Sequence, residues 1–230
     1  LSTVGIPPAM SKLISEYNTL KYYHTKERTY KLGKYLLVGL GILLFIIMFL
    51  GAPFIAKQIM GDNTGGNSLE SITFVIRVIS TAILVVPYLS VTKGYLQGHK
   101  YISASSTSQI IEQIVRVAII VIGSYIFVNV LDLGPTKAVG IAVFGATIGA
   151  LIALLYLLIK IRLNKKELMQ NEKQTKEEKK ITNKDILKKL LMYSVPFVSF
   201  GIALSIYDYI DMTTIINNLV SFGFSTKDAE

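Results

Sequence analysis

The 230-residue sequence contains no cysteine and no tryptophan, and its only histidines are His24 and His99. The lack of cysteine excludes disulfides and thiolate-bound metal, and two histidines are too few for a usual zinc site. The sequence also lacks an HExxH motif, a phosphate-binding glycine loop and a nucleophile paired with a base. We therefore expect no catalytic residue and no metal site in this chain.

Charged residues are scarce, at 17% of the chain, whereas hydrophobic residues make up 51% and the mean hydropathy is +0.50. This composition is typical of membrane proteins. A helix needs about 20 apolar residues to cross a hydrocarbon core of about 30 Å. Five runs approach this length: residues 35–55, 72–91, 110–128, 138–161 and 190–206. The predicted fold class is all-α, a polytopic transmembrane helical bundle.

The first residues, LSTVGIPPAMSKLISEY, have the pattern of the cytoplasmic end of one further span. Pro7 and Pro8 are expected to break its helix. The segment begins in mid-pattern without an initiator methionine, and the tail after Ile216 has no closing element. We interpret the sequence as a fragment.

Lysine and arginine are unevenly distributed between alternate loops. Of the 24 basic residues, six lie in residues 12–34, two in 93–100 and eleven in 160–189. Because short cytoplasmic loops are rich in lysine and arginine, we expect these three segments in the cytoplasm. Residues 61–70, residues 129–137 and the C-terminal tail are then outside.

The longest loop, residues 164–189, is mixed in charge and has no apolar core. It is predicted to be a solvated linker, with a link between two lobes as the alternative. Thr182 and Asn183 are suitable N-caps, so a helix is expected to begin there and continue into the last span.

A polar stripe enters the membrane with the span that contains SQIIEQIVRV. Its members recur at spacings of three and four and so share one helix face: Ser105, Gln109, Glu112, Gln113 and Arg116. A helix over residues 103–130 is about 42 Å long, which places Glu112 at the cytoplasmic mouth and Arg116 about 7 Å deeper. Either Glu112 and Arg116 pair only to anchor the interface, or the stripe lines a water-filled cavity. The cavity is favoured because Gln109 and Gln113 extend the face without adding charge.

Three further charged residues lie within spans. Arg77 is about 12 Å below the outer end of its helix with no acid nearby in that helix, so it either lines a cavity or snorkels. Asp208 and Asp211 are one turn apart on one face of the last span. They are exposed acids at the interface, or a cation site or gate, or partners for Arg77.

Glycine and proline residues in these spans predict a helix kink, a turn and a site of close helix packing. Pro87 is expected to kink its helix, and GYLQG, residues 94–98, to close that helix with a turn. GATIG, residues 145–149, is a GxxxG motif and predicts close helix packing.

Four parts of the sequence, in this order, resemble a known family: GIPPAMSKLISEYN, VIRVIS followed by VPYLSVTKGYLQGHK, SQIIEQIVRVA, and YSVPF followed by YDYID. They resemble the Gram-positive lipid II flippase (MurJ-like) and stage V sporulation protein B-like branch of the multidrug/oligosaccharidyl-lipid/polysaccharide exporter superfamily. The resemblance implies a two-lobe transporter. Residues 1–162 would be most of the N-terminal lobe without its first helix, 163–186 the cytoplasmic linker, 187–216 the first helix of the second lobe, and 217–230 the start of an extracellular loop.

The implied function is flipping of lipid II, an undecaprenyl-diphosphate-linked peptidoglycan precursor for the cell wall, by alternating access in the bacterial cell membrane. The implied partners are the lipid-linked saccharide and membrane lipids, with no nucleic acid, and we expect a monomer. No cofactor is expected, although Na⁺, H⁺ or the membrane potential would drive transport. The alternatives are export of another lipid-linked polysaccharide unit, cation-coupled drug antiport, and a non-transporting scaffold in division or sporulation.

Arginine suits a diphosphate because it donates charge-assisted, often bidentate hydrogen bonds to phosphate. We expect Arg77 and Arg116 as cavity cations, with Glu112 as the gate or orienting partner of Arg116. Gln109 and Gln113 are expected to bind sugar or peptide groups.

Overall fold

The structure is a computed structural model that describes residues 2–60, 68–132, 135–169 and 181–221. All regular elements in these ranges are helices: α1 (Ser2–Thr19), α2 (Tyr23–Met60), α3 (Leu69–Gly98), α4 (Ile102–Ala118) with its π-helical continuations η1 (Ile119–Gly123) and η2 (Ile126–Val130), α5 (Pro135–Leu163), α6 (Lys165–Met169) and α7 (Asn183–Ser221). Five are long and apolar enough to cross a membrane: α2, α3, α4 with its continuations, α5 and α7. The predicted all-α transmembrane bundle is confirmed. Parts of both predicted outer loops, of the linker and of the tail lie outside the described residues.

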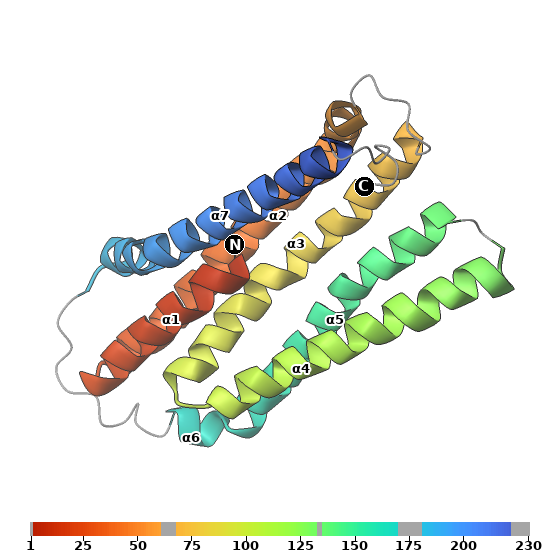
Figure 1. Cartoon of the computed structure of the whole chain (residues 1–230). Helices are drawn as coiled ribbons and strands as arrows, with labels where there is room; N and C mark the ends of the chain where they lie inside the picture. The colour runs from red at the N-terminus through yellow and green to blue at the C-terminus, as the bar shows by residue number, and fades with distance from the viewer. Residues whose placement is uncertain (1, 61–67, 133–134, 170–180, 222–230) are drawn as a thin grey trace.

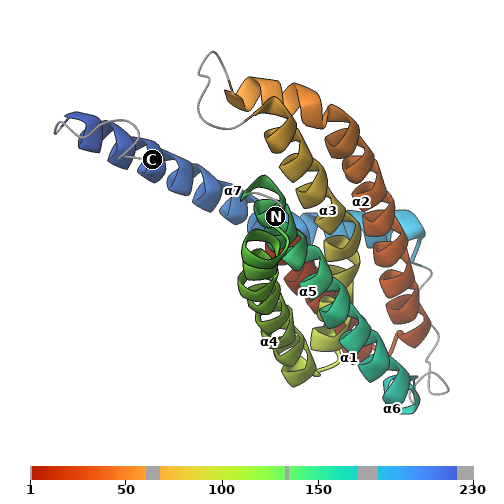
Figure 2. The same ribbon diagram turned by 90° about the vertical axis from the view of Figure 1, so that its right-hand side faces the viewer.

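Helix α3 is the centre of the bundle (Figure 1). It packs against α1, α2 and α5, while α4 packs mainly on α5 and α7 lies mainly against α1. Figure 2 shows the C-terminal half of α7 projecting away from the other helices. The main apolar core joins α1, α3 and α5 in the half of the bundle that holds the α3–α4 turn.

The described parts of the three basic segments lie at this same end of the bundle (Figure 1). Tyr101, at the α3–α4 turn, donates a hydrogen bond of 2.5 Å to Glu167 in α6. Arg28 near the start of α2 donates to the carbonyl oxygen of Ile181, just before α7. By the charge rule we treat this as the cytoplasmic end.

The expected break at Pro7 and Pro8 is wrong, because α1 continues through both residues. Proline is tolerated within helices of membrane bundles where neighbouring helices hold the backbone. Here α1 packs against α3 along one side and α7 along another. Tertiary packing therefore outweighs the local cost of the two prolines.

The expected turn over GYLQG is also wrong, because α3 remains helical to Gly98 and the turn follows at His99 and Lys100, where φ of Lys100 is 67°. The two glycines instead permit close approach of α1. A Cβ atom at Gly94 would lie 2.6 Å from the carbonyl oxygen of Pro7, and one at Gly98 would lie 2.5 Å from Cβ of Ile14.

The GATIG motif packs α5 closely against α4, as predicted. A Cβ atom at Gly149 would lie 2.7 Å from the carbonyl oxygen of Glu112, and one at Gly145 would lie 3.0 Å from Cγ2 of Ile119. These glycines let the α4 backbone rest directly on α5, which fixes the height and rotation of Glu112.

The predicted start of α7 is confirmed. The amide of Asp185 donates to Oγ1 of Thr182 at 3.2 Å, and the amide of Thr182 donates to the Asp185 carboxylate at 3.1 Å. This reciprocal arrangement is a capping box with aspartate in the acidic position.

Candidate functional site: a cationic cavity

A polar cavity of about 250 Å³ lies between α1, α3 and α4, in the half of the bundle that holds the α3–α4 turn. Nine residues line it: Pro7 from α1; Ser90, Lys93 and Gln97 from α3; and Ser105, Gln109, Glu112, Gln113 and Arg116 from α4. The α4 residues are the predicted polar stripe. That stripe faces a cavity.

Glu112 lies at the centre of a three-residue ionic cluster. Its side chain is only 9% exposed, and one carboxylate oxygen accepts from Lys93 Nζ at 3.0 Å while the other accepts from an Arg116 guanidinium nitrogen at 3.0 Å. A carboxylate this buried needs compensating charge, because desolvation of an ion costs several kcal/mol. The two cations supply it and leave the cluster with a net charge of +1.

Arg116 has hydrogen-bonding capacity beyond this ion pair. One of its terminal nitrogens is 3.5 Å from Gln113 Oε1, a long hydrogen bond. Its Nε is buried and has no hydrogen-bond partner among the described residues. A guanidinium has five N–H donors and no acceptor, so Arg116 can still donate to an anion.

The cavity wall also carries neutral polar groups. Gln97 donates to Ser105 Oγ at 2.9 Å and so connects α3 to α4 beside the ionic cluster. Gln109 and Gln113 are exposed. The site therefore combines two cations, one carboxylate and several amide and hydroxyl groups, which suits a ligand with both anionic and hydroxyl or amide groups.

Four of the predicted site residues, Gln109, Glu112, Gln113 and Arg116, thus lie on one cavity, and the predicted Glu112–Arg116 ion pair is present. Sequence reasoning missed Lys93, which was counted only as a basic residue of the cytoplasmic turn. The available signal was a second stripe, since Ser90, Lys93 and Gln97 recur at spacings of three and four on α3.

The other three predicted residues lie elsewhere. Arg77 is exposed on α3, with its guanidinium 5.3 Å from the ring centroid of Phe49 in α2. Asp208 and Asp211 are exposed on the outer part of α7. Within the described ranges, neither acid forms an ion pair with Arg77. A cavity role for Arg77 and a cation or gate role for the two aspartates stay predictions.

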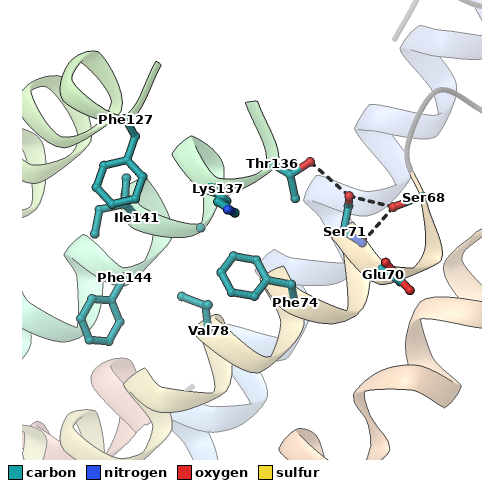
Figure 3. Close-up of a pocket in the computed structure, with 11 residues that line it drawn as sticks. Ser68, Glu70, Ser71, Phe74, Val78, Phe127, Thr136, Lys137, Ile141 and Phe144 are labelled. Atoms are coloured by element: carbon teal, nitrogen blue, oxygen red, sulfur yellow. Dashed lines mark hydrogen bonds between the residues drawn. The ribbon is translucent and has the colours of Figure 1, made fainter. Parts of the chain in front are cut away.

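A larger cavity, of about 670 Å³, lies at the opposite end of the bundle between α3, η2 and α5. Figure 3 shows three phenylalanine rings around it, Phe74, Phe127 and Phe144. Ser71 and Thr136, whose hydroxyls are 3.1 Å apart, also line it. Its wall is mainly apolar and suits hydrocarbon, so the cluster around Glu112 is the better candidate for a charged ligand.

A family profile described as "Polysaccharide biosynthesis protein" matches residues 1–223. Lipid II flippase MurJ of Bacillus subtilis strain 168 is 33% identical over 224 residues, which cover 97% of this chain and 41% of the relative. A flippase moves its substrate without changing covalent bonds, so this name agrees with the expectation of a transporter rather than an enzyme.

Two further relatives come from the same strain. An uncharacterized membrane protein, YabM, is 31% identical over 230 residues, covering 100% of this chain and 40% of the relative. Stage V sporulation protein B is 30% identical over 184 residues, covering 76% of this chain and 33% of the relative. The chain thus spans about two fifths of the length of the first two relatives. No solved structure matches.

Proposed function

The chain belongs to the polysaccharide biosynthesis protein family, and on that premise we propose that it is part of a transporter that moves a lipid-linked saccharide between the leaflets of the cell membrane. The five membrane-spanning helices and the flippase among the relatives support this proposal. The finer proposal is that the substrate is lipid II or a closely related prenyl-diphosphate-linked precursor.

The observation that carries this proposal is the pair of cations, Lys93 and Arg116, that share one buried carboxylate on a polar cavity. A diphosphate is a dianion or more at neutral pH, and charge-assisted hydrogen bonds to phosphate are about twice as strong as neutral ones. The diphosphate would bind the two cations in place of Glu112. The saccharide would hydrogen-bond to Gln109 and Gln113, while the prenyl tail stays in lipid.

The charge of the cavity argues against cation-coupled drug export. A site for a cationic drug would need an excess of carboxylates, whereas this cluster has two cations for one acid. Among the alternatives, export of another lipid-linked polysaccharide unit uses the same diphosphate chemistry and is separated from lipid II only by the head group.

A reconstitution assay tests the proposal. The full-length protein is placed in proteoliposomes with a fluorescent lipid-linked precursor, and flipping is measured as the fraction reached by a membrane-impermeant quencher. We expect the wild type to flip the precursor at least about tenfold faster than protein-free vesicles, equivalent to about 1.4 kcal/mol in barrier height. Arg116→Ala and Lys93→Ala should abolish the acceleration.

The matched control is Lys57→Ala. It removes an exposed lysine in the last turn of α2, which does not line the cavity, and should leave the flipping rate unchanged. In cells, Arg116→Ala should fail to complement loss of the flippase while being expressed normally. Full complementation by this variant would remove Arg116 from the site, and a wild type that does not accelerate flipping would remove the transport proposal.

A further inference from the structure

A second basic cavity, of about 480 Å³, opens at the cytoplasmic end between α2, α3 and α5. Helices α2 and α5 both pack against α3 but make few contacts with each other, which leaves a cleft whose floor includes Tyr95 of α3. The cleft shares no lining residue with the cavity around Glu112. It is lined by Glu27, Tyr30, Lys31, Tyr95, Leu158, Ile161, Arg162, Lys165 and Leu168.

The cleft has an excess of unsatisfied positive charge. Lys31, Arg162 and Lys165 are exposed, and none forms an ion pair with a residue that the structure describes. The single acid, Glu27, accepts a hydrogen bond of 2.6 Å from the Tyr95 hydroxyl. Three cations and one carboxylate give the cleft a net charge of +2, so it favours an anion.

The depth of the cleft can be estimated along α5. Arg162 is roughly 39 Å along α5 from Thr136, and Leu158 roughly 33 Å, at a rise of 1.5 Å per residue. A hydrocarbon core of about 30 Å that begins near Thr136 therefore ends close to Leu158. Arg162 therefore lies at the level of the lipid head groups, and Leu158 lies close to the boundary with the acyl chains.

We propose that this cleft binds the phosphate head group of an anionic phospholipid of the inner leaflet. Basic pockets between transmembrane helices on the cytoplasmic side have the chemistry that such head groups require. Arg162 and the two lysines hold the phosphate, and the acyl chains leave along the apolar residues of α5. The bound lipid fills the space between α2 and α5 and connects two helices that otherwise make few contacts with each other.

Native mass spectrometry of the detergent-purified full-length protein tests this site. Phosphatidylglycerol, which is anionic, and phosphatidylcholine, which is zwitterionic, are added with identical acyl chains. We expect wild-type protein to retain phosphatidylglycerol with about tenfold preference over phosphatidylcholine, because basic residues near the membrane surface attract anionic head groups. The triple variant Lys31→Gln, Arg162→Gln, Lys165→Gln should lose this preference.

The matched control removes three exposed basic residues at the same end of the bundle but outside the cleft: Lys166→Gln, Lys184→Gln and Lys188→Gln. It should keep the preference within about twofold. Equal loss in both triple variants would mean unspecific charge attraction and would overturn the site, as would equal retention of the two lipids by the wild type. Displacement of the lipid by millimolar inorganic phosphate would also overturn it, because a free anion would then be the ligand. All six side chains are exposed, so a melting temperature within a few degrees of wild type verifies folding.

Discussion

Replacing Glu112 by glutamine separates two roles for the carboxylate at the centre of the cavity. If Glu112 orients Arg116, its removal should weaken ligand binding. If instead Glu112 occupies the anion position between Lys93 and Arg116 until a diphosphate displaces it, its removal should strengthen binding and slow release. The geometry favours the second role, because each carboxylate oxygen already accepts from one cation at 3.0 Å.

The expected gain in binding free energy for Glu112→Gln follows from the charges in the cluster. Glu112→Gln raises the net charge of the cluster from +1 to +2 and removes a negative charge that lies beside any phosphate bound to the same cations. Two like charges about 4 Å apart repel by about 4 kcal/mol at an effective dielectric constant of about 20. Water in the cavity and movement of the displaced side chain reduce this, so we expect a gain of about 1 to 2 kcal/mol, or about 5- to 30-fold tighter binding.

The assay pairs binding with transport in the full-length protein. Binding of a short-chain prenyl diphosphate is measured by scintillation proximity, and flipping by the quencher assay. Glu112→Gln should bind more tightly and flip more slowly, because the ligand is no longer displaced by the carboxylate. Glu16→Gln is the matched control, since Glu16 is also ion-paired, to Lys189 at 2.7 Å, but lies outside the cavity.

The reasoning would be refuted if Glu112→Gln and Glu112→Ala both weakened binding of the prenyl diphosphate. That result would mean that the carboxylate holds Lys93 and Arg116 in place. Glutamine can still accept hydrogen bonds through its amide oxygen whereas alanine cannot, so stronger binding by both variants identifies the lost charge as the cause. The expression of both Glu112 variants is compared with that of Glu16→Gln, so that a folding defect is distinguished from a change in binding.

Three further predictions test the fold around the site. Gly149→Ala should destabilise the protein by about 1 to 3 kcal/mol and weaken ligand binding, because its Cβ would lie 2.7 Å from the Glu112 carbonyl oxygen; Gly39→Ala, with nothing within 4 Å, should not destabilise it. Burial lowers the pKa of His99 to about 4, below its usual 6.5. The unfolded state therefore binds more protons at acidic pH, and stability should fall by about 2 kcal/mol between pH 7 and 5 in thermal unfolding, but not in His99→Gln. Arg77→Gln should change flipping by no more than about twofold, because Arg77 lies on Phe49 outside the cavity around Glu112; a loss as complete as that of Arg116→Ala would support the predicted cavity role of Arg77.

The helices were predictable because the bilayer sets their length and composition. Apolar runs define the five spans, and helical spacing alone puts Glu112, Gln113 and Arg116 on one face. Where sequence reasoning failed, a second helix decided the outcome. Pro7 continues the helix of α1 because α3 and α7 pack beside it, and Gly94 stays helical because α1 needs the space that a side chain would fill.

Lys93 shows why the site itself was only half predicted. Spacing rules compare residues within one helix, and Lys93 is nineteen positions before Glu112 on a different one. Its contact with Glu112 depends on the turn at His99 and Lys100, which folds α4 back along α3. Within the sequence, Lys93 reads as one of the basic residues of a short cytoplasmic turn, and only the packing of α4 against α3 shows that it lines the cavity.

The contact with Lys93 also bears on whether Arg116 is part of a site or only an interface anchor. An anchor needs only its own i, i+4 partner and a route to the head groups, which Arg116 and Glu112 could provide on α4 alone. Here the carboxylate is shared with a second helix and is almost completely buried, although one cation would suffice to neutralise it. The extra cation leaves an uncompensated positive charge beside a polar cavity, which an anchor does not need and an anionic ligand does.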